Sequence, residues 1–458
     1  MSDEAPKTSA FLAFFAEVWT NLRLAAPMAI AQFGMTAIGL VDVAILGRSS
    51  AADLGGASIG RSIGFTALAL GIGAGAALEP LAAQALGAKE PHVAWRAFRS
   101  SLVGAVLVTL PCALVAFGAS FLLGPIGVDP DLVAPARAFV IAQTPGLLIA
   151  STFFVGKTFL QANDRPRSAL VGSVVANVVN LVVCSVLVLG DSALVRVGLA
   201  PRGLPALGAL GGGLASTIAH AVLAGFVLVP SWRLRPPADA PVADGPSVRK
   251  VLALGTPIGF QLLAEIGVFS LAAVLAGKIG KVAVSAHQIA IGLASFTFMG
   301  VLGISGATAV RVGNAVGGGT NPRRAGLAGI GLGAVYMVCS SALFLLFPRR
   351  LASLFTDQPD VLELGVSLLA IAAAFQIFDG VQGVAAGALR GAGDVRFPFI
   401  VNVGGHWLVG FPLALVLAFG LHLGAPGLWW GLLAGLAVVA ILLFGRFVVI
   451  TRKEIERV

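Results

Sequence analysis

Long apolar stretches recur along the entire chain, and they restrict the folds that it can adopt. Several run for about 20 residues or more, the length that a helix needs to cross a hydrocarbon core of roughly 30 Å. Only 11% of the 458 residues are charged, whereas soluble domains have about 25%. We therefore predict an all-α polytopic membrane protein.

Polar breaks divide the sequence into twelve expected membrane spans, each boundary with an error of several residues. Residues 1–21 precede the first span, and "FLAFFAEVWTNL" (11–22) is typical of a short amphipathic helix at the membrane interface. The start of the chain has no compact apolar region ending in a cleavage site, so we expect no removable signal peptide. The spans are expected at 22–47, 54–80, 97–121, 133–160, 168–190, 211–230, 250–277, 282–310, 325–347, 362–389, 397–421 and 425–449.

The charge distribution predicts the orientation of the chain. Although the net charge is +9, the basic residues are spread through short loops, which indicates membrane topology and not nucleic-acid binding. Twelve spans put both termini on one side, and most of the 30 Lys and Arg residues lie in segments on that side. The positive-inside rule therefore predicts cytoplasmic termini in an inner (plasma) membrane, with a tail over 450–458. The cysteines Cys112, Cys184 and Cys339 lie far apart in apolar spans and form no disulfide or metal motif.

One linker divides the expected spans into two equal sets. Residues 231–249 break the hydrophobic pattern with Pro, Asp and Arg, leaving six spans in 22–230 and six in 250–449. The halves match at a constant offset of 230 residues, without a gap through their first two spans. Equivalent spans share one orientation, and such parallel repeats are typical of transporters with a cavity between two bundles. The matched pairs are Leu22 and Leu252, Leu24 and Leu254, Pro27 and Pro257, Gly47 and Gly277, Ile59 and Ile289, Gly73 and Gly303, Ala77 and Ala307, Gly87 and Gly317, and Asp164 and Asp394.

Of the 21 acidic residues, those well inside the expected spans are Asp42, Glu79, Glu265 and Asp379. An intramembrane carboxylate is expensive and indicates a functional site, unless it reaches water or satisfies a neighbouring helix. Glu265 and Asp379 have no acidic counterpart in the first half, where the matched positions are Met35 and Ile149. Symmetric packing would not require two unmatched acids in one bundle. Facing carboxylates can bind a hard cation through their oxygen atoms or share a proton.

Several motifs together resemble the multidrug and toxic compound extrusion (MATE) family over essentially the whole chain. The first half has "AAPMAIAQFGMTAIGLVDVAILG", "LGGASIG" and "PLAAQALGAKE". The second half has "GTPIGFQLLAEIGVF", "AHQIA", "ATAVRVGNAVGGG" and "FQIFDGVQGVAAGALRGAGDVRFP". Its acids look most like those of the NorM branch. The resemblance implies a V-shaped pair of six-helix bundles that exports cationic amphipathic compounds by antiport against Na⁺ or H⁺, without a cofactor.

The resemblance also implies roles for the intramembrane acids. The NorM branch uses acids at the motif positions of Glu265 and Asp379 for coupling, and both would be metal ligands if the ion is Na⁺. A tyrosine of that branch is replaced here by Phe375, which removes a possible ligand. The family ties the acid at the position of Asp42 to proton or substrate handling. A nearby family Asn or Asp is replaced by Cys184, which argues against a full proton relay in the first bundle and shifts the expected coupling to Glu265 and Asp379.

Other polar residues in the spans are expected to line a cavity or to pack. His287 either titrates near neutral pH or is a hydrogen-bonded packing residue. Glu79, near the cytoplasmic end of its span, is expected to form an interfacial or gating salt bridge with a loop Arg, and Arg61 and Arg311 are further possible partners for acids. The expected cavity residues are Phe375, Gln261, Gln376, Gln382, His287, Gln288, Asn402, Asn177 and Asn180.

Two alternative functions stay open at this point. A flippase for lipid-linked sugars, from the same superfamily, would need basic residues in its cavity. The only basic residues within the expected spans are Arg61, Lys157 and Arg311, compared with four acids. A membrane scaffold or enzyme would not need asymmetric acids on a repeated framework. The "GKT" at 156–158 lacks the glycine and strand of a phosphate-binding loop, so we expect an ion gradient to supply the energy. Twelve spans suffice for a functional monomer, whereas the choice between Na⁺ and H⁺ and the substrate range stay undetermined.

Overall fold

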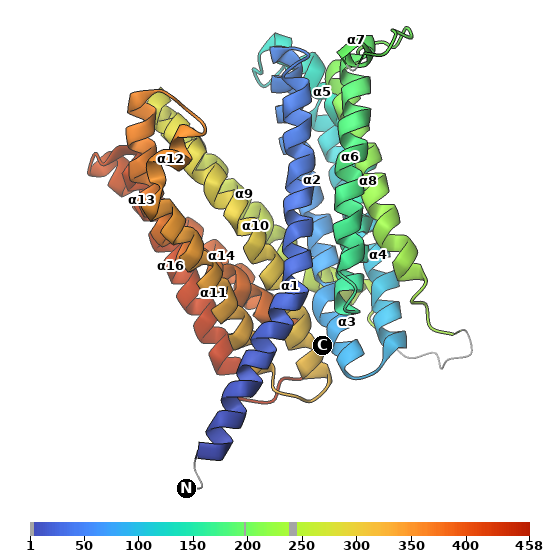
Figure 1. Cartoon of the computed structure of the whole chain (residues 1–458), viewed down its shortest axis with the longest axis vertical. Helices are drawn as coiled ribbons and strands as arrows, with labels where there is room; N and C mark the ends of the chain where they lie inside the picture. The colour runs from blue at the N-terminus through green and yellow to red at the C-terminus, as the bar shows by residue number, and fades with distance from the viewer. Residues whose placement is uncertain (1–3, 197, 238–244) are drawn as a thin grey trace. The chain divides into compact units, whose positions relative to one another are not determined.

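The computed structural model describes residues 4–196, 198–237 and 245–458, and this part of the chain is helical throughout its regular structure (Figure 1). Twelve of its helices are long and apolar enough to cross a membrane, which confirms the all-α, twelve-span prediction. The first half contains α1 (Glu4–Leu46), α2 (Ala51–Ala76), α3 (Leu78–Gly87), α4 (Pro91–Ala119), α5 (Pro130–Ala162), α6 (Arg167–Leu189), α7 (Asp191–Arg196) and α8 (Gly208–Trp232). The second contains α9 (Val248–Ile279), α10 (Lys281–Gly317), α11 (Pro322–Leu346), α12 (Pro348–Ser353), α13 (Pro359–Gly391), α14 (Arg396–Val403), η1 (Gly404–Gly410), α15 (Phe411–Leu415), η2 (Val416–Gly420) and α16 (Gly424–Ile450).

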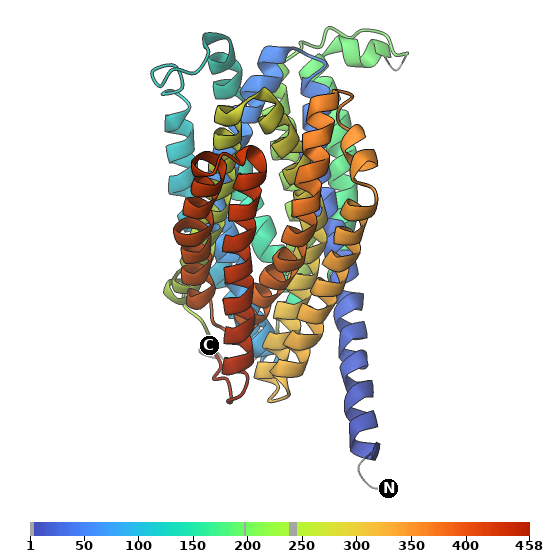
Figure 2. The ribbon, with the colours of Figure 1, turned by 90° about the vertical axis from the view of Figure 1, so that its left-hand side faces the viewer.

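The first helix is longer than its span. The expected boundary between a separate helix over 11–22 and a first span is wrong, because α1 is continuous over 43 residues. At 1.5 Å per residue it measures about 65 Å, roughly twice the thickness of a hydrocarbon core. Its first turns extend past the ends of α10 and α11 (Figure 1, Figure 2). Their exposed apolar residues share one helix face, with spacings of three and four, and an interfacial position for them stays a prediction. They are Leu12, Phe15, Trp19 and Leu22.

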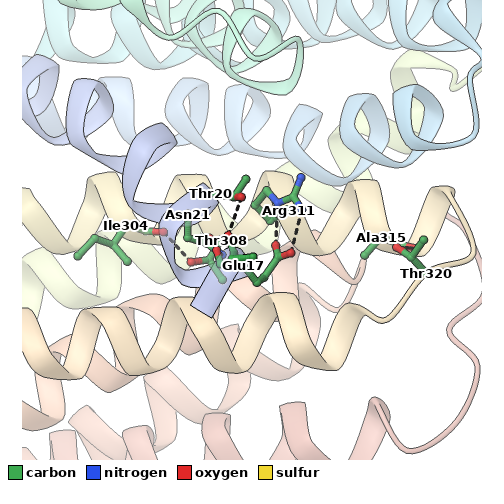
Figure 3. Close-up of polar contacts among 9 residues, drawn as sticks. Glu17, Thr20, Asn21, Ile304, Thr308, Arg311, Ala315 and Thr320 are labelled. Carbon is green, nitrogen blue, oxygen red and sulfur yellow. Dashed lines mark hydrogen bonds and ion pairs between the residues drawn. The ribbon is translucent and has the colours of Figure 1, made fainter. Parts of the chain in front are cut away.

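An ion pair fastens this part of α1 to α10. Arg311 donates from Nε and Nη2 to the two carboxylate oxygens of Glu17, at 2.8 and 3.0 Å (Figure 3). Further along, Ala29 approaches Gly303 so closely that a Cβ atom on the glycine would lie 2.6 Å from the Ala29 Cα. The sequence suggested Arg311 as a possible partner for an acid inside the spans, but its partner in the structure is Glu17, which lies before the expected first span.

The chain forms two compact units whose bounds differ from the expected bundles 22–230 and 250–449. Unit 1 consists of Met1–Ala29, Glu79–Glu90 and Phe260–Val458, and unit 2 of Ile30–Leu78 and Pro91–Gly259. The linker 231–249 therefore falls within unit 2, and its residues 238–244 lie outside the described part of the chain. The chain passes from one unit to the other inside α1 and inside α9, at two places separated by the repeat offset of 230 residues.

The repeat is visible as matched contacts within the units. In unit 1, Gly303 of α10 lies against Ala29 of α1, and in unit 2 Gly73 of α2 lies against Gly259 of α9. A Cβ atom on Gly73 would lie 2.6 Å from the Gly259 backbone nitrogen. Because Gly73 and Gly303 differ by 230, as do Ala29 and Gly259, the offset found in the sequence also relates the packing.

The eleventh span departs from regular α-helix. It begins as α14, widens to a π-helix over η1, returns to α-helix in α15 and widens again in η2. Pro412 lacks the N–H that an α-helix would use at that position, which favours a local change of hydrogen bonding. Small residues let the widened segment approach α16, since a Cβ atom on Gly410 would lie 3.1 Å from the Gly435 Cα. Such π-helical turns occur frequently at functional sites.

Candidate functional site

Three amide side chains converge on one oxygen of Glu265 in unit 1. The Nε2 atoms of Gln261 and Gln382 donate to Glu265 Oε1 at 3.2 and 3.4 Å, and Asn402 Nδ2 donates to the same atom at 2.5 Å. Gln261 precedes Glu265 by four residues on α9, so both lie on one helix face. Gln382 comes from α13 and Asn402 from α14. The carboxylate is therefore held where three spans meet.

Asp379 belongs to the same site. It precedes Gln382 by three residues on α13, which places both on the face that meets Glu265. The carboxyl groups of Asp379 and Glu265 act on each other electrostatically. Among the described residues, neither group has an ion-pair partner. The structure thus brings together the two acids that the sequence singled out.

The π-helical span supports the Glu265 site from a third side. Trp407 Nε1 donates to the backbone carbonyl of Ala264 at 3.1 Å, and His406 Nδ1 lies 3.0 Å from the Asn402 carbonyl oxygen. Asn402 is fully buried, and its Oδ1 has no hydrogen-bond partner among the described residues. The sequence had suggested Asn402 as a cavity residue but had missed Trp407 and His406. Nothing in the sequence pairs a residue of the eleventh span with Ala264.

The chemistry of the Glu265 site suits a hard cation or a proton. Carboxylate and amide oxygens are the ligands that hard cations prefer. In the described part of the chain, no group of three or more His, Cys, Asp or Glu side chains is arranged to hold a metal ion. The two carboxylates and an unpartnered amide oxygen fit a hard cation such as Na⁺ better than a soft transition metal.

Most other predicted cavity residues of unit 1 lie in packed surroundings. Phe375 is 2% exposed, and its ring lies 5.8 Å from that of Trp429, which is in turn 5.8 Å from the His287 ring. His287 is buried, and neither ring nitrogen has a hydrogen-bond partner among the described residues. Gln376 Oε1 accepts a hydrogen bond from Thr297 Oγ1 at 3.2 Å. None of these residues is hydrogen-bonded to Glu265 in the described structure.

Gln288 and Glu79 also make no described hydrogen bond to Glu265. Gln288 is exposed and has no described hydrogen bond to Glu265 or Asp379. Glu79 Oε2 accepts a hydrogen bond from Arg390 Nε at 3.0 Å. The salt bridge expected for Glu79 is present, but its partner lies in the last turn of α13 and not in a loop.

Asp42 in unit 2 has a different environment. Its two oxygens accept hydrogen bonds from Asn180 Nδ2 at 2.8 Å and from Ser216 Oγ at 2.9 Å. Cys184 and the guanidinium of Arg61 also interact with this carboxylate. Asp42 is therefore satisfied by side chains from α2, α6 and α8, unlike the acids of unit 1. Ser216 was missed because a serine in an apolar span carries no signal of its own.

Asn177 is hydrogen-bonded to backbone carbonyl groups and not to a carboxylate. Its Nδ2 donates to the carbonyl oxygens of Gly34 and Ser173, each at 2.7 Å. The first of these bonds joins α6 to α1. Asn177 thus holds the two helices that carry Asn180 and Asp42, without touching the acid in the described structure.

The MatE family model matches the chain twice, over residues 27–186 and 257–416. The chain belongs to this family. The two matches begin 230 residues apart and end 230 residues apart, which is the repeat offset, and they contain Asp42, Glu265, Asp379 and Asn402. The resemblance to the MATE family is confirmed.

Curated relatives of this MatE protein match it over nearly its whole length. A probable multidrug resistance protein NorM of Bradyrhizobium diazoefficiens is 36% identical, over 94% of this chain and 93% of the relative. The multidrug resistance protein NorM of Burkholderia vietnamiensis is 35% identical, over 93% of this chain and 92% of the relative. These relatives confirm the NorM-like branch.

Solved structures show the same fold as this MatE protein. The eukaryotic MATE transporter AtDTX14 superposes with a TM-score of 0.81 at 22% identity, covering 95% of this chain and 96% of that chain. A MOP superfamily transporter from Pyrococcus furiosus, described as having a binding pocket of reversed polarity, gives a TM-score of 0.81 at 20% identity with the same coverage. At these identities the likeness concerns the fold alone.

Proposed function

We propose that this MatE protein is a secondary active multidrug efflux transporter, which exports cationic amphipathic compounds by antiport with Na⁺ or H⁺. The observation that carries this proposal is the pair Glu265 and Asp379, two acids inside membrane spans without an ion-pair partner in the described structure. The names of the NorM relatives support multidrug export as the activity. The same reasoning assigns the protein no enzymatic reaction and no cofactor.

Competition for a small number of negative charges would couple the two fluxes. Each charge at the centre of a span costs about 2.5 to 3.5 kcal/mol, so a cation that neutralises the site lowers its free energy. When the site faces outward, Glu265 and Asp379 take up the coupling ion and the cationic drug is released. When the site faces inward, the ion leaves to the cytoplasm and the drug is accepted. Simultaneous binding is unfavourable because both species need the same two carboxylates.

We assign Asp42 a secondary role in coupling. Both of its oxygens already accept hydrogen bonds from Asn180 and Ser216, and Arg61 supplies a nearby positive charge. This carboxylate therefore needs a further cation less than Glu265 and Asp379 do. Asp42 becomes a second proton carrier only if a pH gradient drives transport.

The basic residues of the spans do not favour the flippase alternative. A pyrophosphate would need cationic side chains that are available to it. Arg311 is paired with Glu17, Arg61 donates to a backbone carbonyl at 2.7 Å, and Lys157 Nζ donates to Gln32 Oε1 at 3.0 Å. The export of cations by a monomer in the inner membrane, with both termini in the cytoplasm, remains our proposal.

Ethidium efflux from liposomes tests this proposal. The purified protein is reconstituted, and a Na⁺ gradient and a pH gradient are imposed separately. We expect one of them to drive efflux, and Glu265→Gln and Asp379→Asn to abolish it while still inserting. Glu363→Gln is a matched control, because Glu363 is an exposed carboxylate near the start of the helix that carries Asp379. Normal efflux in both site variants would refute the assignment, and no efflux under either gradient would favour the flippase.

A further inference from the structure

We propose that Asn402 is a further member of the cation site, where it positions Glu265 through its amide nitrogen and offers its amide oxygen to a monovalent metal cation. This inference rests on the proposed function and extends it to a residue of the π-helical eleventh span. It also commits the site to a metal ion, because a hard cation is bound by neutral oxygens together with charged ones.

The orientation of the Asn402 amide is fixed by its nitrogen. Because Nδ2 donates to Glu265 Oε1, Oδ1 is the other arm of the planar amide and takes no part in that bond. That oxygen is buried and has no hydrogen-bond partner among the described residues, on a side chain that is itself 0% exposed. A buried acceptor without a partner costs about 1 to 3 kcal/mol, and native structures rarely contain such an unsatisfied acceptor. A bound cation would satisfy this oxygen.

The backbone that carries Asn402 is anchored to α9. Trp407, five residues further on, donates to the carbonyl of Ala264, the residue beside Glu265. Gly267 makes room for this contact, because a Cβ atom there would lie 3.1 Å from the Trp407 ring. The π-helical turn over η1 therefore joins α9 directly, and its anchor fixes Asn402 relative to Glu265.

The oxygen atoms of Glu265, Asp379 and Asn402 together form a ligand set that suits a metal cation. Hard cations are bound by several oxygens, charged and neutral together. All three amide donors occupy Oε1 of Glu265, which leaves Oε2 and the Asp379 carboxylate for the ion. The amide oxygen of Asn402 adds a neutral ligand to these two acids.

Sodium-dependent thermal stabilisation of the purified protein tests this inference without relying on transport. The melting temperature is measured against NaCl at constant ionic strength, with choline chloride as the replacement salt. We expect Na⁺ to stabilise the wild type, and Asn402→Leu to raise the half-saturating concentration at least about tenfold, the lower range for the loss of a residue that orients a ligand. Asn402→Ala removes the same two polar atoms with a different change in packing, and it should raise the half-saturating concentration in the same way. Glu363→Gln should behave as the wild type does.

The outcomes separate this inference from the proposed function. If Glu265→Gln loses the response to Na⁺ while Asn402→Leu keeps the wild-type concentration dependence, the role of Asn402 is refuted and the function of Glu265 stands. If Na⁺ does not stabilise the wild type, the metal site is refuted, and efflux driven by a pH gradient then decides the proposed function separately. If Asn402→Leu does not fold, a wild-type concentration dependence in Asn402→Ala overturns the inference.

Discussion

The ion pair between Glu17 and Arg311 gives a prediction that can be worked out from the structure. It joins the first turns of α1 to α10 within unit 1, through two charge-assisted hydrogen bonds at 2.8 and 3.0 Å (Figure 3). We consider the variants Glu17→Gln and Arg311→Gln and the double variant. Each single change leaves one charged group without its partner, whereas the double change removes both charges.

The expected magnitude lies between those of surface pairs and buried pairs. Exposed pairs contribute about 0.2 to 1 kcal/mol, and breaking a fully buried pair costs about 3 to 5 kcal/mol. The side chains of Arg311 and Glu17 are 29% and 17% exposed, so solvent screens the pair in part. We therefore expect each single variant to lose about 1 to 2 kcal/mol of unfolding free energy. The double variant should lose less than the sum by about 1 kcal/mol, the coupling energy of residues in contact.

Unfolding by SDS in mixed micelles, followed by tryptophan fluorescence, measures these differences. Arg324→Gln is the control, because it removes one exposed positive charge near the start of α11, and it should change the stability by no more than about 0.5 kcal/mol. Losses of Glu17→Gln and Arg311→Gln that add within about 0.3 to 0.5 kcal/mol in the double variant would show that the two groups act independently. The reasoning about this ion pair would then be wrong.

Three further predictions concern packing, a buried hydroxyl and a loop. Gly303→Ala should destabilise the protein by about 1 to 3 kcal/mol because its Cβ would meet the α1 backbone, whereas Gly331→Ala, which has open space, should not; equal stabilities in the SDS titration would contradict this. Ser216→Ala removes a donor from buried Asp42 and should cost about 1 to 3 kcal/mol in the same titration, while Ser216→Thr, which keeps the hydroxyl, should cost less. Backbone N–H groups of Arg202, Leu204 and Gly203 donate to the Asp191 carboxylate and hold its pKa below the ordinary value. The stabilisation from these hydrogen bonds is therefore complete above pH about 3.9 and is lost as the pH falls through the lowered pKa. Hydrogen exchange of residues 198–204, corrected for intrinsic rates, should accelerate in that acidic range. It should also accelerate at neutral pH in Asp191→Ala, which has no acceptor; unchanged protection in this variant would exclude the contact.

Local sequence patterns predicted the spans and the repeat well, for physical reasons. The number of spans follows from apolar length, and the offset of 230 follows from matched residues in the two halves, among them Gly73 and Gly303, which both lie against a neighbouring helix. Gln261 was predictable as a neighbour of Glu265, because four residues bring two side chains to one helix face. The pairing of Glu265 with Asp379 was expected from their asymmetry.

Contacts between distant helices were harder to predict. The partners Asn402 and Ser216 lie 137 and 174 residues from the acids that they contact, and the polarity of a single residue does not say which helix it will face. The π-helical turns of the eleventh span also gave no signal, because they change hydrogen bonding and not the apolar length. The continuity of α1 was missed because an amphipathic pattern describes a surface and does not say where a helix ends.

The chain passes from one compact unit to the other inside α1 and inside α9, and this affects the order in which the units can be completed during synthesis. Unit 2 contains the segment of α9 before Phe260, and unit 1 contains the part of α1 before Ile30 together with Glu79–Glu90. Neither half of the repeat therefore carries a complete unit. During synthesis of the first half, the α2 surface around Gly73 has not yet met its packing partner α9, which is synthesised more than 150 residues later. Two fragments produced by a cut within 231–249 would each hold a piece that the other lacks, so each compact unit can be completed only when both fragments are present in the same membrane.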